Sequence, residues 1–317
     1  MSRVALLKGG RSLERQVSLR SAAQVQDALE RLGHDVAEID VGPDLVDRLE
    51  EASADVAFVA LHGRGGEDGT VQELLELVGL PYTGSGPAAC IRCMDKVVAK
   101  HAMRDAGIPT PDFYAFSETA FRDLGAAKAL PAIEARLDFP IVVKPAGQGS
   151  ALGIKFAASA ADVPGALVAA FSYDSKVLLE RHVAGRDLAV SVIEGPDGPE
   201  ALPLVEAIPH EDDFYDFEAR YEIGRTDFRC PADVGDAATR RAQELAVAVY
   251  RLLGCYGFAR VDLMLEESTG ELEVLEANAI PGLTETSLLP QAAEAAGISF
   301  DALIERVLDL ALARAPA

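Results

Sequence analysis

Two short apolar segments near the C-terminal end, residues 257–265 and 272–277, are separated by a Ser-Thr-Gly turn. Apolar segments on both sides of such a turn predict an antiparallel β-hairpin. With the turn centred near Thr269, strand pairing places Asp262 opposite Glu276. An antiparallel sheet is therefore part of the fold, and two acidic side chains face each other on it.

The same pairing places Arg260 opposite Asn278, and residues two apart along a strand lie on one face of the sheet. Carboxylate and amide oxygens are ligands that Mg²⁺ prefers, and this ion completes its shell with water and phosphate oxygens. A solvated strand face is the alternative, but both strands are otherwise rich in Val, Leu and Met, where polar side chains need partners. The pattern predicts a magnesium site formed by Asp262, Glu276 and Asn278.

The first third of the chain alternates short apolar strands with helical patterns. Residues 4–7 and 56–61 are predicted strands, and residues 17–32 are a predicted amphipathic helix. This βαβ pattern is typical of a parallel α/β sheet. The unit ends at Asp95, which is the predicted N-cap of a helix over residues 96–106.

The remaining sequence predicts two further units, of the α+β class. Predicted strands lie at residues 140–144, 152–156, 176–181, 188–193 and 204–208, and predicted helices lie at residues 237–253 and from residue 300. Residues 209–231 form a long polar segment without periodicity, and such segments are more often functional than accidental. A length of 317 residues fits two or three domains, and we expect domains at residues 1–95, 96–183 and 184–317.

Charge and hydropathy exclude several classes of partner. The chain has 29 basic and 51 acidic residues, a formal net charge of −22, so nucleic acid and anionic membranes are poor partners. An anionic ligand must therefore meet a local positive pocket. No segment approaches the about 18 apolar residues of a spanning helix, and the apolar start breaks at Lys8, unlike a signal peptide. We expect a cytoplasmic protein.

Four cysteines in a chain of this length do not form a disulfide framework. Cys90 and Cys93 form a CxxC pattern, which is compatible with redox activity or half of a zinc site. Cys230 and Cys255 are too distant in sequence to complete a zinc knuckle. Packing of small buried thiols is the favoured interpretation.

A glycine-rich turn, residues 145–153, follows the predicted strand that ends at Lys144. Glycines allow backbone amides to turn toward phosphate oxygens, and a lysine adds a point charge. The segment lacks the GxxxxGK[ST] pattern of a Walker loop, and hairpin turns are also glycine-rich. Only seven of the 29 basic residues are lysines, which makes Lys144 and Lys96 the candidates for phosphate binding.

Residues 180–183 end a predicted strand at the second domain junction. An adenine ring could pair with the main chain there, with Glu180 accepting from its exocyclic amine and Asp187 at a distance that suits ribose hydroxyls. Taken alone, the segment is more typical of an ordinary edge strand.

Two glycine loops, residues 9–14 and 62–69, follow predicted strands of the first unit. The carboxyl ends of strands are the usual ligand side of an α/β sheet. A lone histidine such as His62 is nevertheless more often structural.

Six motifs in order along the whole chain resemble those of D-alanine–D-alanine ligases, members of the ATP-grasp superfamily. They are residues 61–69 (LHGRGGEDG), 81–86 (PYTGSG), 94–96 (MDK), the turn after Lys144, residues 214–221 (FYDFEARY) and residues 276–282 (EANAIPG). The resemblance implies an ATP-grasp fold of mixed α/β and α+β class with an N-terminal Rossmann-like (pre-ATP-grasp) domain. It also implies that ATP phosphorylates the carboxylate of one D-alanine and that the amine of a second attacks the acyl phosphate, which supplies the dipeptide of peptidoglycan precursors.

The resemblance also implies roles for individual residues. Glu14, supported by Ser150 and Tyr221 and close to His62, would hold the first ammonium group. The nucleotide would contact Lys96, Lys144, Glu180, Arg181, Val183, Asp187 and Arg220. Asp262, Glu276 and Asn278 would carry two Mg²⁺ ions, for which Mn²⁺ can substitute. Arg260 and the Gly282 amide would stabilise the oxyanion, Ser287 and Leu288 would receive the second carboxylate at a helix N-terminus, and Tyr215 would lie with Tyr221 on a closing loop.

Two alternatives remain open. One is a related ligase with another acceptor, such as D-serine, D-lactate or an amino acid of secondary metabolism. The other is a nucleotide-binding regulator without catalysis; it predicts loss of the metal ligands, and the presence of all three disfavours it. Arginine at 181 and 220, where the family usually has lysine, is a departure from its pattern, because the two residues are not interchangeable at a phosphate. The resemblance also implies a homodimer formed through the N-terminal domain.

Overall fold

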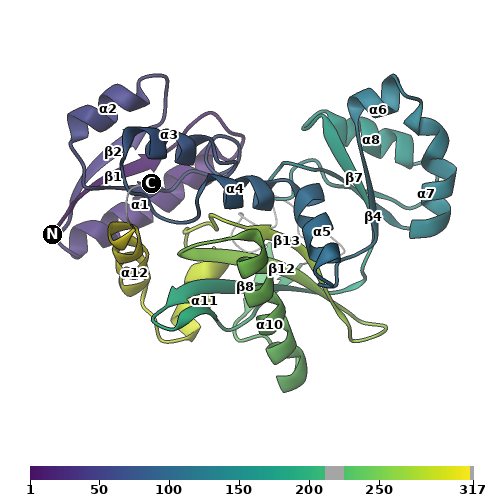
Figure 1. Cartoon of the computed structure of the whole chain (residues 1–317). Coiled ribbons are helices and arrows are strands. Elements are labelled where there is room, and N and C mark those ends of the chain that lie inside the picture. Colours follow the sequence, from purple (N-terminus) through teal and green to yellow (C-terminus); the bar gives the residue numbers. More distant parts are fainter. Residues whose placement is uncertain (211–224, 315–317) are drawn as a thin grey trace.

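The computed structural model describes residues 1–210 and 225–314, and in these ranges the chain forms three sheets in three lobes (Figure 1). The first sheet is parallel, with strand order β2-β1-β3. The elements of this lobe are β1 (Arg3–Lys8), α1 (Arg15–Arg31), β2 (Asp35–Asp40), α2 (Leu45–Ala52), β3 (Val56–Val59), α3 (Thr70–Val78) and α4 (Pro87–Met94). The predicted βαβ pattern is confirmed, and β2, α3 and α4 are additions to it.

Strand β1 is buried on both faces, which explains its unbroken apolar sequence. Ala5 and Leu7 belong to a core with α2 and α3, whereas Val4 and Leu6 belong to a core with α1 and the C-terminal helix α12 (Phe300–Ala313). The first and last parts of the chain therefore share a core, as the position of α12 beside α1 shows (Figure 1).

The central sheet is antiparallel, with strand order β4-β7-β5-β6 and a core of its own. Its elements are β4 (Phe113–Ser117), α6 (Glu118–Arg122), a 3₁₀ helix (Ala126–Ala129), α7 (Leu130–Leu137), β5 (Ile141–Pro145), β6 (Lys155–Ala157), α8 (Val163–Phe171) and β7 (Lys176–Arg181). The edge-strand interpretation of residues 180–183 is wrong, because β7 pairs with both β4 and β5. The strand predicted at residues 152–156 begins later, because Ser150, Ala151 and Gly153 all have positive φ and form a turn.

The third sheet is antiparallel, with strand order β11-β10-β8-β12-β13, and β9 pairs with β8. This part of the chain contains β8 (Gly185–Gly195), β9 (Gly198–Ala201), β10 (Val205–Pro209), β11 (Thr226–Arg229), α10 (Asp236–Leu253), β12 (Phe258–Glu266), β13 (Leu272–Asn278) and α11 (Leu288–Ala295). The predicted loop at residues 209–231 therefore includes a strand, β11, which pairs with β10.

Helix α5 (Lys96–Asp105) connects the first lobe to the central sheet and packs against α10 and β13. Its predicted N-cap is confirmed, since the Asp95 carboxylate accepts from the amides of Val97 (2.9 Å) and Val98 (3.1 Å). This packing places Lys96 and Lys100, in the first turns of α5, between the central and third sheets. None of the helices in the described ranges has the length and apolar character needed to cross a membrane.

Candidate active site

The β12-β13 hairpin has the predicted register where its polar residues lie. Asp262 pairs with Glu276, and Arg260 pairs with Asn278. The register then shifts by one residue between Asp262 and Leu263, so a β-bulge on β13 separates this end of the hairpin from its turn. Bulges commonly redirect side chains near active sites.

Each acidic side chain on this face has a cationic partner. Arg260 donates to both oxygens of Asp262, at 2.6 and 2.8 Å, and the Lys96 ammonium lies 3.0 Å from Glu276 Oε2. Arg260, Asp262 and Lys96 are buried, where unpaired charges would be costly. The face is therefore an electrostatically balanced cluster.

The oxygen donors of this face suit a hard cation. Two carboxylates face each other across the strands, and the Asn278 amide oxygen accepts from the Ile280 amide at 3.1 Å. Mg²⁺ takes few protein oxygens, so two carboxylates and one amide are a sufficient set. Among residues 1–210 and 225–314, no three His, Cys, Asp or Glu side chains gather into a metal-binding group. The donor set therefore fits magnesium only when the Asn278 amide is counted.

A small pocket of about 30 Å³ joins this face to the glycine-rich turn. Five of the predicted site residues line this pocket: Lys96, Ser150, Arg260, Glu276 and Asn278. Gln148 and Cys93 line it too. Lys96 also donates to the Gln148 carbonyl at 2.6 Å, which fixes the turn relative to α5.

A larger cavity of about 490 Å³ lies between the central and third sheets. Predicted nucleotide contacts line it: Lys144, Glu180, Arg181, Val183 and Asp187. Apolar side chains of Phe156, Met264 and Leu275 line it too, as expected for a site that takes a flat ring. Glu276 lines both this cavity and the small pocket, so one carboxylate lies at the boundary between them.

The lysine in this cavity belongs to a buried ion-pair cluster. Lys144 Nζ pairs with Glu180 Oε1, and Lys100 Nζ lies 2.6 Å from Glu180 Oε2. The two lysines hold the pKa of Glu180 below its usual value, although burial alone would raise it. Lys100 is fully buried and was not predicted, but it lies one helical turn after Lys96 in a chain with only seven lysines, which was the available signal.

Arg181 is held by acidic residues of the neighbouring hairpin. Its guanidinium contacts Glu266 at 2.9 Å and Glu273 at 2.7 Å. The arginine at this position therefore ties the end of β7 to β12 and β13, across the cavity wall.

Glu14 lies at the start of α1 and is buried against the glycine-rich turn. Ser150 donates to Glu14 Oε1, and a Cβ at Gly149 would lie 2.8 Å from Glu14 Oε2, so the turn needs glycine to come this close. Burial and the nearby Glu67 raise the pKa of Glu14 to about 7, against the opposing effect of Ser150. Oε2 of Glu14 is buried and has no hydrogen-bond partner among the described residues, which suits a cationic ligand.

His62 is held by residues that the sequence analysis did not single out. Nδ1 of His62 lies 3.0 Å from Glu67 Oε1, and Nε2 lies 3.1 Å from Ser21 Oγ. Ser21 Oγ also accepts from the Leu283 amide at 3.2 Å. The motif at residues 61–69 contains Glu67, but no local pattern identifies Ser21 as the second partner of His62.

Gly282 lies against Ser287, because a Cβ at this glycine would be 2.7 Å from Ser287 Oγ. Ser287 Oγ accepts from the Thr284 amide at 2.9 Å and precedes Leu288, the first residue of α11. The predicted helix N-terminus at Ser287 and Leu288 is confirmed. The predicted residues Tyr215, Arg220 and Tyr221 lie outside the described residues.

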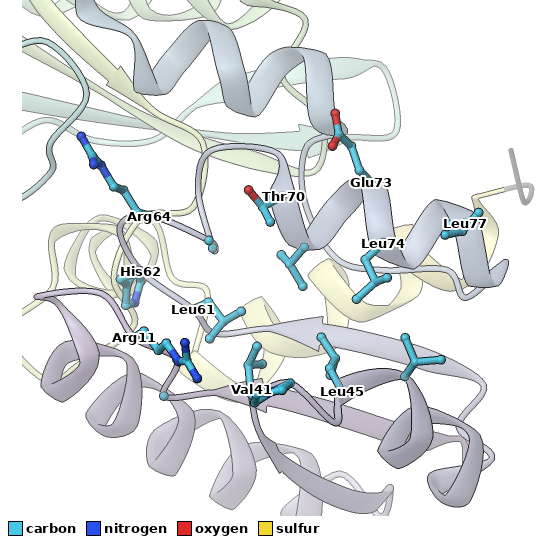
Figure 2. Close-up of a pocket in the computed structure, with 18 residues that line it drawn as sticks. Arg11, Val41, Leu45, Leu61, His62, Arg64, Thr70, Glu73, Leu74 and Leu77 are labelled. Carbon is cyan, nitrogen blue, oxygen red and sulfur yellow. The ribbon is translucent and has the colours of Figure 1, made fainter. Parts of the chain in front are cut away.

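A larger cavity, of about 790 Å³, lies elsewhere, in the first lobe. Figure 2 shows Val41, Leu45 and Leu61 facing Leu74 of α3 across it, with His62 at one end. Its lining is mostly apolar and contains none of the hairpin residues, so size alone does not locate the chemistry.

The cysteine pattern has a structural explanation. Cys90 and Cys93 are buried free thiols, and Cys93 Sγ lies 3.6 Å from Cys255 Sγ. The packing interpretation of these residues is confirmed.

Comparisons with known proteins agree with this geometry. A family model of the D-Ala D-Ala ligase C-terminus matches residues 102–309, and one of the N-terminus matches residues 43–85. The D-alanine–D-alanine ligase of Syntrophotalea carbinolica is 44% identical over 306 residues, which is 96% of this chain and 95% of the relative. That of Moorella thermoacetica is 42% identical over 310 residues, which is 98% of this chain and 99% of the relative.

Solved structures give the same result. A D-alanine–D-alanine ligase from Bacillus anthracis matches with a TM-score of 0.85 at 32% identity, and covers 98% of both chains. Its structure complexed with ATP matches with a TM-score of 0.82 at 30% identity and the same coverage. The predicted ATP-grasp fold is confirmed, and the chain belongs to the D-alanine–D-alanine ligase family.

Proposed function

We propose that this protein is an ADP-forming ligase that joins two D-alanines to D-alanyl-D-alanine, through an acyl phosphate, for peptidoglycan precursors. The observation that carries the proposal is the position of Glu276, at the boundary between the nucleotide cavity and the small pocket. Phosphoryl transfer needs the nucleotide phosphates and the acceptor carboxylate to meet where charge is neutralised, and this boundary is lined by Lys96, Arg260 and Asn278. Family membership supports the same reaction.

The nucleotide would occupy the cavity of about 490 Å³. Lys144 and Lys96 would contact its phosphates, and Asp187 would contact the ribose. Because the Glu180 carboxylate is engaged by two lysines, we assign the adenine contact to the main chain of residues 181–183.

Magnesium would be held by Asp262, Glu276 and Asn278, and Mn²⁺ could take its place. When bound, the metal supplies neutralisation of phosphate charge. The contacts of these carboxylates with Arg260 and Lys96 keep the site balanced before nucleotide binds. Arg260 and the Gly282 amide would then donate to the developing oxyanion.

Glu14 would hold the ammonium group of the first D-alanine through its unpartnered Oε2, with Ser150 fixing the other oxygen and His62 close by. Ser287 and Leu288, at the N-terminus of α11, would receive the carboxylate of the second. The family resemblance adds Tyr215, Arg220 and Tyr221 of the expected closing loop, which would exclude water from the acyl phosphate. The domains proposed for these tasks are residues 1–95, 96–183 and 184–317.

The proposal is tested by incubating the protein with ATP, Mg²⁺ and a panel of D-amino acids, L-amino acids and D-hydroxy acids. We expect ADP release that depends on D-alanine and yields D-alanyl-D-alanine. Preference for D-serine, D-lactate or another acceptor would instead support a related ligase. ATP binding without ADP release for any acceptor would support the non-catalytic alternative.

We also propose a homodimer formed through the first lobe. The apolar groove between α2 and α3 is open, and Leu77 of α3 is 82% exposed beside it (Figure 2). An exposed apolar surface of this kind marks an interaction site, and a second copy that presents the same surface would cover it.

Light scattering during size-exclusion chromatography tests the dimer. We expect twice the chain mass of 33.5 kDa for the wild type and a shift toward the single-chain mass for Leu77→Arg. Leu124→Arg is the matched control, because Leu124 is 79% exposed on the central lobe. A wild type that runs as a single chain at micromolar concentration would contradict the proposal.

We propose a cytoplasmic location because the reaction consumes ATP and because the four cysteines are free thiols, as expected in a reducing compartment.

A further inference from the structure

A fully buried lysine lies behind the nucleotide cavity and has no role in the reaction proposed above. The Lys100 side chain on α5 is 0% exposed, and its ammonium group lies 2.6 Å from Glu180 Oε2. Lys144 pairs with the other oxygen of the same carboxylate. Lysine is almost never fully buried unless it is paired, so the position of Lys100 requires an explanation.

Lys100 is also linked, through Thr110, to a strand of the third sheet. Its ammonium donates to Thr110 Oγ1, and the Thr110 hydroxyl donates to the Val274 carbonyl at 2.8 Å. Val274 belongs to β13, the strand that carries Glu276, while Glu180 belongs to β7. Through Thr110, Lys100 therefore joins β7, which precedes the proposed adenine contact, to β13, which carries two of the three proposed metal ligands.

The charges of the cluster define what Lys100 contributes. Lys144 lines the nucleotide cavity, whereas Lys100 does not. Lys100, Glu180 and Lys144 together carry one net positive charge, and without Lys100 their sum is zero. In that case the charge of Lys144 would be neutralised by the buried Glu180 carboxylate and would not be available to a phosphate.

We propose that Lys100 is a positioning residue for ATP: it neutralises Glu180 and thereby leaves the charge of Lys144 available to the nucleotide phosphates. This inference rests on the proposed ATP-dependent function, and it adds a residue that does not touch the nucleotide. It predicts that the affinity for ATP depends on the summed charge of Lys100, Glu180 and Lys144, and not on a contact between Lys100 and the nucleotide.

The protonation of Lys100 gives an independent test. Burial lowers the pKa of Lys100, and so does Lys144 on β5, whereas Glu180 on β7 and Glu273 on β13 raise it; the net pKa is about 8. Above pH 8 the Lys100 ammonium group loses its proton, so Lys144 becomes the only cationic partner of Glu180 in this ion-pair cluster. The KM for ATP is then expected to rise between pH 8 and 9.

The first experiment measures KM for ATP at saturating D-alanine and pH 7.5. We expect Lys100→Met to raise KM about tenfold, the usual effect of losing a contact to a charged group. The double variant Lys100→Met/Glu180→Gln restores the net charge and should return KM to within about threefold of the wild-type value. Lys128→Met, an exposed lysine of the central lobe, is the matched control and should leave KM unchanged.

A double variant as impaired as the single variant, or more so, would overturn the proposal, because a merely structural role predicts that two losses add. If Lys100→Met does not fold, the pH profiles of the wild type and Lys100→Arg decide. A rise of KM above pH 8 that Lys100→Arg lacks supports the proposal, and identical profiles overturn it. Failure of the proposed function itself is distinguishable, because the wild type would then release no ADP in response to D-alanine.

Discussion

Each carboxylate of the proposed site already has an ionic or hydrogen-bonding partner within the protein. Asp262 is held by Arg260, Glu276 by Lys96, and Glu14 by Ser150. Partners of this kind fix side-chain positions before substrate binds, and such preorganisation is the main source of electrostatic catalysis.

The raised pKa of Glu14 predicts that the KM for the first D-alanine depends on pH. Its pKa of about 7, raised chiefly by burial, means that the carboxyl is neutral below pH 7 and cannot pair with an ammonium group. Because D-alanine remains a cation at its amine throughout this range, KM for the first D-alanine should fall as pH rises and level off above pH 7. The slope below pH 7 should be about tenfold per pH unit, as for one proton.

Glu14→Gln is the test of that assignment. The variant should bind D-alanine more weakly at pH 8 and should lose the pH dependence, because no proton is exchanged at this position. A variant that keeps the wild-type profile would assign the titration to another group.

Glu276→Gln should lower the rate of ligation by at least about a hundredfold while the fold is retained, because a carboxylate at the boundary of the two cavities is removed. The measurement is ADP release at saturating substrates, with circular dichroism as the check on folding. Glu271→Gln makes the same chemical change at an exposed position of the same hairpin and should be neutral. Near wild-type ADP release by Glu276→Gln would refute the role assigned to this residue.

At the scale of elements, the hairpin shows how far the sequence could predict the site. Its alternation of polar and apolar residues was sufficient to pair Asp262 with Glu276, and the structure has this pairing. The bulge was not predictable, since one unpaired residue on β13 changes the register without changing the composition.

Other elements were missed for physical reasons. Strand β11 is only four residues long, Thr226–Arg229, and two of its side chains are charged, so its periodicity is weak and its pairing with β10 decides its conformation. Lys100 was missed because its ionic partner, Glu180, is distant in sequence. Tertiary contacts of this kind leave no local pattern.

The N-terminus of α5 gives a prediction about an element. Asp95→Ala should lower the free energy of unfolding by about 1–2 kcal/mol, because two backbone amides of the first turn lose their acceptor. Asp95→Asn keeps an acceptor oxygen and loses only the partly exposed ion pair with Lys176, so its effect should be smaller. Urea denaturation measures both variants. Equal losses would show that the ion pair, and not the cap, stabilises this helix.

On the scale of the whole molecule, the three sheets are not equally connected. The first and third lobes share two cores, to which β1, α1, α10 and α12 contribute, whereas the central sheet has a separate core. The cavity proposed for the nucleotide lies between the central sheet and the third sheet, where polar contacts such as Arg181 with Glu273 join them. The residues proposed to bind D-alanine therefore lie mainly on the more extensively packed part of the molecule.

We expect this arrangement to couple ATP cleavage to the joining of two D-alanines. The most direct test quantifies ADP and D-alanyl-D-alanine in one reaction mixture with ATP, Mg²⁺ and D-alanine. We expect equal amounts of both products, and no ADP when D-alanine is omitted. ADP release without D-alanine, or with D-alanine but without dipeptide, would contradict it.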